Sequence, residues 1–208
     1  MTSCAILGAS GHGKVIAEIA ELNGYTNICF FDDRWPEINK IEHYNLLGDT
    51  NGLLESIKEY DLVVIAIGHN EIRLAKQDLL ESVGAVFGVL IHPKAVVSKY
   101  ASIGNGSVVM ANSVVNPFVT IGSASIINTG CTIDHDCFLA DGVHISPGVN
   151  VAGGVSIGRA SWVGIGSQIK QQVSIGKQVI VGAGSTVVND IVDNQVVMGS
   201  PAKPNLIK

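Results

Sequence analysis

The chain has 208 residues, with 13 Lys and Arg against 18 Asp and Glu and a formal net charge of -5. This acidic balance, without any run of lysines and arginines, argues against a nucleic-acid surface, because contacts to phosphate backbones need clustered cations. No stretch approaches the roughly 18 apolar residues of a membrane helix, and the start lacks the basic leader of a signal peptide. We therefore expect a cytoplasmic protein without membrane insertion.

The first ninety residues alternate short apolar runs with segments of helical period. The expected strands are residues 4–7, 27–31, 61–68 and 85–90, and the expected helices are residues 14–23 and 70–84. After Asp61, the run at 61–68 is continuously apolar, which is typical of a parallel strand buried on both faces. This order predicts a small Rossmann-like α/β domain over residues 1–90.

The sequence GASGHG, residues 8–13, follows the first expected strand and leads into the first expected helix. Backbone amides and the helix dipole at such a place favour a phosphate group. The spacing is G-x-x-G-x-G and not the dinucleotide pattern G-x-G-x-x-G, so the motif alone is a weak signal. Asp32 and Asp33 follow the second expected strand about 20 residues later, where a carboxylate can hold ribose hydroxyls. Together these features predict nucleotide binding.

The second half of the chain, residues 91–208, has a period of six. Every sixth residue from Val97 to Val187 is Ile, Leu or Val, and four residues after each of them a small residue such as Ser107 is common. A glycine such as Gly104 often follows the aliphatic residue directly. This period suits a parallel β-helix whose coils have three six-residue edges, with the aliphatic side chains pointing inward.

His135 and His144 lie nine residues apart in the sequence IDHDCFLADGVHI. On the repeat, His135 falls near a corner and His144 faces outward on another edge, so in one chain the two rings lie on different sides. A site that uses both rings therefore needs two chains of a cyclic oligomer. Asp134 and Asp136 flank His135, and a neighbouring carboxylate orients an imidazole and raises its basicity, as a general base requires.

Other interpretations of these residues are possible. The repeat could be a purely structural solenoid, and the sequence DHD could be a solvated polar corner. A catalytic zinc site would need a third imidazole. The remaining candidate is His92, at the start of the repeat and more than two coils away, so we expect no metal.

Seven motifs occur in the order GASGHGKV, FFDD, IAIGHNEIR, LIHPKAVVS, NTGCTIDHDC, VHISPGV and GSPAK. With these motifs the chain resembles hexapeptide-repeat sugar acetyltransferases over essentially its whole length. It is most similar to UDP-4-amino-sugar N-acetyltransferases of the bacillosamine type, with sialic acid O-acetyltransferases as near relatives. The resemblance implies a left-handed β-helix over residues 91–208, acetyl-CoA as co-substrate, a homotrimer with active sites between subunits, and a role in surface glycan biosynthesis.

Position by position, the resemblance implies that His135 is the general base and that Asp136 is its acidic partner, which is glutamate in the bacillosamine enzyme. It implies contacts to a UDP-amino-sugar from Ser10, Gly11, His12, Asp32, Asp33 and Gly68. It implies contacts to acetyl-CoA from His144, Ile165 and Ala183. The expected reaction is direct acetyl transfer to the C4 amine of the sugar, with His135 removing a proton. O-acetylation of a sugar hydroxyl and a non-catalytic nucleotide-binding scaffold are the alternatives.

Overall fold

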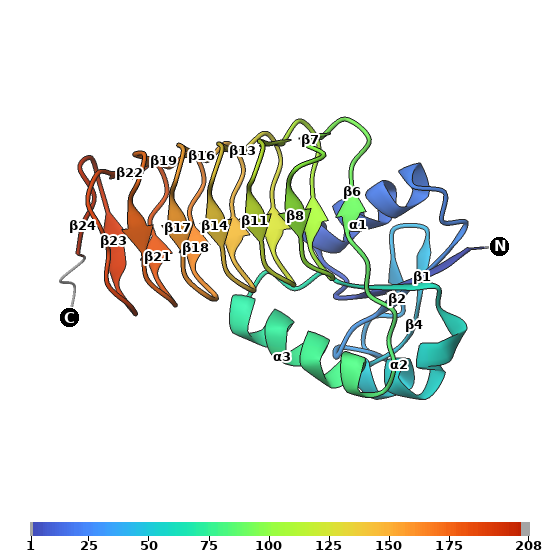
Figure 1. The fold of residues 1–208 in the computed structure, drawn as a ribbon. Helices are drawn as coiled ribbons and strands as arrows, with labels where there is room; N and C mark the ends of the chain where they lie inside the picture. The colour runs from blue at the N-terminus through green and yellow to red at the C-terminus, as the bar shows by residue number, and fades with distance from the viewer. Residues whose placement is uncertain (1, 205–208) are drawn as a thin grey trace. The chain divides into compact units, whose positions relative to one another are not determined.

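The computed structural model describes residues 2–204, and the chain divides into two compact units between Pro93 and Lys94 (Figure 1). Residues 205–208, the end of the expected β-helix domain over residues 91–208, lie outside the described residues. None of the helices within residues 2–204 has the length and hydrophobicity that crossing a bilayer requires.

The first unit is a five-stranded sheet with three α-helices. Its elements are β1 (Ser3–Leu7), α1 (Gly11–Leu22), β2 (Asn27–Phe31), β3 (Lys40–Ile41), β4 (Tyr44–Gly48), α2 (Thr50–Ser56), the 3-10 helix η1 (Ile57–Glu59), β5 (Leu62–Ile65), α3 (Asn70–Ser82) and β6 (Leu90–Ile91). The sheet order is β3-β4-β2-β1-β5, and all neighbours are parallel except β3 and β4. The carboxyl ends of β1, β2 and β5 therefore meet at one edge of the sheet.

The sequence-based boundaries of this unit need correction at three places. The strand expected over residues 61–68 is shorter, because β5 spans only Leu62–Ile65 and the chain leaves the sheet before Gly68. The strand expected over residues 85–90 is wrong, because only Leu90–Ile91 is a strand. Before it, the chain bonds to β5 through the amide of Val63, which donates to the carbonyl of Val86 at 2.8 Å, and Gly88 lacks the side chain that stabilises a strand. In addition, α1 begins at Gly11, inside the segment expected to be a turn.

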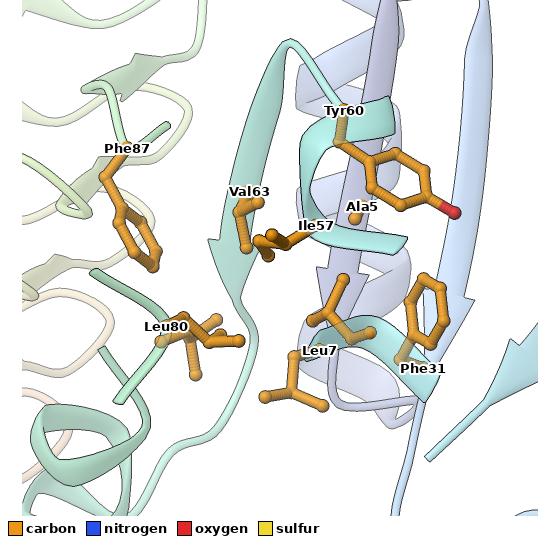
Figure 2. Packing of buried hydrophobic residues seen from close by; sticks show 10 residues of the cluster. Ala5, Leu7, Phe31, Ile57, Tyr60, Val63, Leu80 and Phe87 are labelled. Carbon is orange, nitrogen blue, oxygen red and sulfur yellow. The ribbon is translucent and has the colours of Figure 1, made fainter. Parts of the chain in front are cut away.

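A hydrophobic cluster fixes this sheet edge in place (Figure 2). It consists of buried residues from β1, β2, α2, η1, β5 and α3, from the residue that follows η1 and from the segment after α3: Ala5, Leu7, Phe31, Leu53, Ile57, Tyr60, Val63, Ile65, Leu80 and Phe87. The rings of Phe31 and Tyr60 meet edge to face, with their centroids 5.8 Å apart. Phe31 is the last residue of β2, so this packing holds the loop that carries Asp32 and Asp33.

The second unit consists of stacked coils of two-residue parallel strands. They are β7 (Val96–Val97), β8 (Ser102–Ile103), β9 (Val108–Val109), β10 (Val114–Val115), β11 (Thr120–Ile121), β12 (Ile126–Ile127), β13 (Thr132–Ile133), β14 (Phe138–Leu139), β15 (His144–Ile145), β16 (Asn150–Val151), β17 (Ser156–Ile157), β18 (Trp162–Val163), β19 (Gln168–Ile169), β20 (Ser174–Ile175), β21 (Ile180–Val181) and β22 (Thr186–Val187). The chain closes with β23 (Val196–Met198) and β24 (Lys203–Pro204), which pair antiparallel.

Successive strands of the coils belong to three sheets in turn (Figure 1). The first sheet has the order β22-β19-β16-β13-β10-β7, the second β20-β17-β14-β11-β8, and the third includes β24-β23-β21-β18-β15-β12-β9. The aliphatic residues of the six-residue period are the second residues of β7–β22, which confirms the predicted repeat. From β7 to β19, each strand pairs with the strand eighteen residues later, as Thr132 pairs with Asn150.

Two features of the corners explain the rest of the repeat. Every sixth residue from Gly106 to Gly184 has a positive φ, including non-glycine residues such as Asp136. The glycines that follow the aliphatic residues allow the next coil to approach closely. A Cβ on Gly158, for example, would lie 2.5 Å from the carbonyl carbon of Gly176.

Candidate functional site

The first candidate site is the corner that follows β13, where His135 and Asp136 form a close pair. Nδ1 of His135 lies 2.7 Å from Oδ2 of Asp136, and both side chains are well exposed. The hydrogen bond to Asp136 and the negative charge of Asp134 raise the pKa of His135 above its ordinary value. Because Nδ1 donates to the carboxylate, Nε2 is the ring nitrogen that accepts a proton when the imidazole is neutral.

Neighbouring coils hold this corner in place. The amide of His135 donates to Oδ1 of Asp134 at 2.8 Å, and the same oxygen accepts from Nδ2 of Asn116 at 2.8 Å. The amide of Asp136 donates to the carbonyl of Pro117 at 3.2 Å. A pocket of about 410 Å³ lies at this corner and is lined by Asp134, His135, Asp136, Ala152, Gly153, Gly154, Gln171 and Gln172. An oriented imidazole with an accessible Nε2 at such a pocket is suited to removing a proton from a bound substrate.

The second candidate site is a mainly apolar groove on the third sheet. His144 of β15 stacks on Trp162 of β18, with ring centroids 5.7 Å apart and planes inclined by 11°. Nε1 of Trp162 donates to Oγ of Ser146 at 2.7 Å. The groove has a volume of about 410 Å³, and its lining includes His144, Ile165 and Ala183, the residues implied to contact acetyl-CoA. The sequence analysis did not single out Trp162, although it is one of only two tryptophans in the chain.

The structure does not bring His135 and His144 together. His135 follows a strand of the first sheet, whereas His144 belongs to the third sheet, and the two pockets share no lining residue. Among residues 2–204, no three His, Cys, Asp or Glu side chains are grouped so that they could hold a metal ion.

The third candidate site lies in the first unit, at the start of α1. Ser10 is the N-cap residue of this helix and has an extended backbone conformation, but its side chain makes no hydrogen bond to the helix. A Cβ added at Gly11 would meet open space. Nε2 of His12 is buried without a hydrogen-bond partner among the described residues. Burial and the charge of Arg73 lower the pKa of His12 to about 4, so its ring is neutral at physiological pH.

Arg73 of α3 is a residue of this site that the sequence analysis missed. Its side chain is fully buried, and it donates to the carbonyls of Ile67 and Gly68 at 2.9 and 3.1 Å and to Oδ1 of Asn70 at 2.9 Å. Burial lowers its pKa to about 10, so it keeps its positive charge at neutral pH. Gly68, one of the predicted contact residues, is therefore held through its carbonyl by a buried cation. The available signal was weak, because Arg73 shares the buried face of α3 with the polar residues Asn70 and Gln77 as well as with Leu74 and Leu80.

Asp32 and Asp33 lie at the end of β2, as predicted, but both carboxylates already bind protein groups. Asp32 accepts from the amide of Ala9 at 2.7 Å and from Nε of Arg34 at 2.8 Å, and the Arg34 hydrogen bond lowers its pKa to about 2. Asp33 accepts from Oγ1 of Thr50 at 2.6 Å. Asp32 thus joins the loop after β1 to the loop after β2.

Comparison with known proteins identifies relatives of both units. Residues 3–80 match the family model described as the PglD N-terminal domain. A UDP-N-acetylbacillosamine N-acetyltransferase from Bacillus subtilis is 35% identical over 117 residues, which are 53% of this chain and 52% of that protein. The chain thus spans about half the length of the curated relative that it matches.

Solved structures match over almost the entire chain. The acetyltransferase domain of PglB from Neisseria gonorrhoeae, in complex with acetyl coenzyme A, is 42% identical, covers 98% of both chains and has a TM-score of 0.93. PerB from Caulobacter crescentus, in complex with CoA and GDP-perosamine, is 34% identical, covers 99% of this chain and 98% of that chain, and also has a TM-score of 0.93. These matches confirm the predicted fold class, a Rossmann-like α/β domain followed by a left-handed parallel β-helix.

Proposed function

Because the chain belongs to the hexapeptide-repeat family of sugar N-acetyltransferases, we propose that it transfers an acetyl group from acetyl-CoA to the amine of a nucleotide-linked amino sugar. Its 42% identity to a solved acetyltransferase domain, over 98% of both chains, establishes this family. The acceptor amine is the one on C4 of a UDP-linked amino-dideoxy sugar, and the product serves surface glycan synthesis. The observation that carries the proposal is the His135–Asp136 pair at the pocket that follows β13.

In the proposed reaction, the sugar amine forms a bond to the thioester carbonyl carbon while Nε2 of His135 takes a proton from the nitrogen. The carbon–sulfur bond then breaks, and CoA leaves as the thiolate. Asp136 fixes the ring through Nδ1 and stabilises the imidazolium that forms, because the two atoms are 2.7 Å apart. These reaction steps need neither a metal ion nor a covalent intermediate on the enzyme.

The groove on the third sheet is the proposed site for acetyl-CoA. Its lining is mainly apolar, and Trp162 presents a half-exposed indole beside His144. An apolar surface of this kind suits the long flexible arm of acetyl-CoA, and backbone groups of the coils can bind the amides of that arm.

Replacement of Trp162 by alanine is expected to raise the KM for acetyl-CoA by up to about tenfold, because an aromatic contact contributes about 0.5–1.5 kcal/mol and about 1.4 kcal/mol corresponds to a factor of ten. Steady-state kinetics at varied acetyl-CoA would measure the effect. Phe138 is also an exposed aromatic residue on a strand, in the second sheet, so F138A is the matched control and should keep the wild-type KM. Equal KM values for W162A and wild type would contradict this assignment.

The first unit is the proposed binding domain for the nucleotide sugar. The neutral His12 ring, the open space at Gly11 and the buried Arg73 lie at the carboxyl edge of a parallel sheet, where ligands of α/β domains bind. In this proposal Ser10, Gly11 and His12 contact the sugar nucleotide, and Asp32, Asp33 and Gly68 shape the same pocket.

We further propose a homotrimer in which His135 of one subunit and His144 of its neighbour serve one active site. The separation of the two residues on different sheets of one β-helix supports this arrangement. Mixed trimers of H135A and H144A subunits are expected to regain activity, because some interfaces then combine an intact His135 with an intact His144. Co-refolding the two inactive variants and measuring CoA release tests this. Mixtures no more active than the separate variants would contradict a shared site.

The activity itself is tested by incubating the protein with acetyl-CoA and a UDP-4-amino-4,6-dideoxy sugar and measuring free thiol. We expect release of CoA and formation of an amide, with the GDP-linked sugar as the comparison for nucleotide preference. A product that loses its acetyl group in mild base would instead be an ester and would indicate O-acetylation. No turnover with a panel of nucleotide amino sugars would favour a non-catalytic scaffold.

A further inference from the structure

The ring of His135 lies against the backbone of the next coil, over Gly153. The strands before these residues are paired, with Ile133 opposite Val151, so Gly153 occupies in its coil the place that His135 occupies in its own. A Cβ built on Gly153 would lie 2.7 Å from both Cε1 and Nε2 of the His135 ring. This is far inside van der Waals contact, so any side chain at residue 153 must displace the ring.

Backbone conformation does not explain the glycine at this position. Gly153 does not have the positive φ found at its neighbour Gly154, so an L-amino acid could adopt its conformation without strain. The same place in the other coils is held by side chains of different kinds: Lys99, Pro117, Gln171 and Asn189. The glycine thus occurs in the coil that directly follows His135, and the nearest atoms that explain it belong to the His135 ring.

The backbone here is also held too firmly to move away. The amide of Gly154 donates to the carbonyl of His135 at 2.9 Å, and the carbonyl of Gly153 accepts from the amide of Gln172 at 3.0 Å. The His135 side chain, by contrast, is 60% exposed. When a Cβ is added at residue 153, the ring therefore moves and the coil stays in place.

We propose that Gly153 is a positioning residue for acetyl transfer: by lacking a side chain, it lets the His135 ring keep its contact with Asp136 and its Nε2 at the pocket. This inference rests on the proposed role of His135 as general base. Asp134 and Asp136 are the charged groups that act on the ring, and the facing residues Gln171 and Gln172 are uncharged. Loss of the Asp136 contact therefore changes both the basicity of His135 and the place of Nε2.

The test is the variant G153A, studied as the full chain by NMR titration of His135 and by CoA release. The His135 resonance is assigned by its absence in H135A. We expect a melting temperature close to wild type, a titration midpoint that falls toward 6.5, and a decrease in kcat/KM of about 10²-fold, the effect of a misplaced catalytic group. D136N should lower the midpoint in the same way, and adding G153A to it should lower it no further.

The matched control is G148A. Gly148 also lies at a corner of the β-helix, and a Cβ there meets open space, although its φ of 67° makes alanine strained. G148A should therefore lose stability and keep the His135 midpoint and kcat/KM. An unchanged midpoint and rate in G153A would overturn the inference. A lowered midpoint with a wild-type rate would support the positioning of the ring by Gly153 and would show instead that His135 is not the base.

Discussion

The variant H135A is expected to lose at least ~10²-fold in kcat/KM for acetyl transfer, because a positioned general base contributes typically 10²–10⁴-fold. In the proposed reaction the amine loses its proton while it attacks the thioester, and among the residues that line the pocket after β13 no other imidazole can accept that proton. The KM for acetyl-CoA should change little, because His135 lies outside the groove on the third sheet. CoA release at saturating and subsaturating sugar measures both quantities.

The pH dependence gives this prediction a second readout. The contact with Asp136 and the charge of Asp134 raise the pKa of His135, so the ring stays protonated to a higher pH than a free histidine. The active, neutral form therefore accumulates as the pH rises, and kcat/KM should increase through an inflection above 6.5. H135A should lose this inflection. H43A is the control, because His43 is exposed and lies in the first unit. Loss of activity in both variants, or in neither, would contradict the assignment.

The variant F31A is expected to lower the free energy of unfolding by about 3–5 kcal/mol, as is usual when a buried phenylalanine is truncated. Phe31 is 2% exposed and packs edge to face against Tyr60 within the cluster of Figure 2. Domains are stable by only about 5–15 kcal/mol, so this loss is a large share of the total. Because Asp32 follows Phe31 directly, binding of the nucleotide sugar should weaken as well.

Urea denaturation followed by circular dichroism measures the change in unfolding free energy. The control is L47A, because Leu47 is exposed on the neighbouring strand β4 and its truncation should cost within about 0.5 kcal/mol. A loss below about 1 kcal/mol in F31A would contradict the role of this cluster in holding the sheet edge.

The β-helix could be predicted residue by residue because its structural period appears in the sequence as an aliphatic residue at every sixth position. Each inward position accepts only an aliphatic side chain, and the residues from Val97 to Val187 at intervals of six became the second residues of the strands. The hand of the helix came from the resemblance, because the general preference for parallel crossovers is right-handed.

The first unit was harder to predict because its elements are short. β3 has two residues, and β4 contains the polar Asn45 and ends at Gly48, so neither forms a clear apolar run. Residues 85–89 are partly buried without being a strand, which shows that burial and strand pairing leave similar patterns in the sequence.

Within the candidate sites, predictability depended on distance along the chain. His135 and Asp136 are adjacent in the sequence, so the motif DHD was enough to predict their contact. Arg73 and His12 are brought together only by the parallel sheet, and no local pattern reports such a pair. Gly153 is an intermediate case, because an eighteen-residue coil makes its position opposite His135 readable once the repeat is known.

In the β-helix, the residues that specify the coil differ from the residues that are available for chemistry. Inward strand residues and corner residues of positive φ specify the coil, whereas the residue two places after each strand, the place of His135, is free to vary. Gln171 and Gln172 occupy, two coils later, the places of His135 and Asp136, and Gln172 has a positive φ, as Asp136 has. The backbone thus fixes the angular position of a pair such as His135 and Asp136 around the β-helix, and the sequence selects its height along the axis.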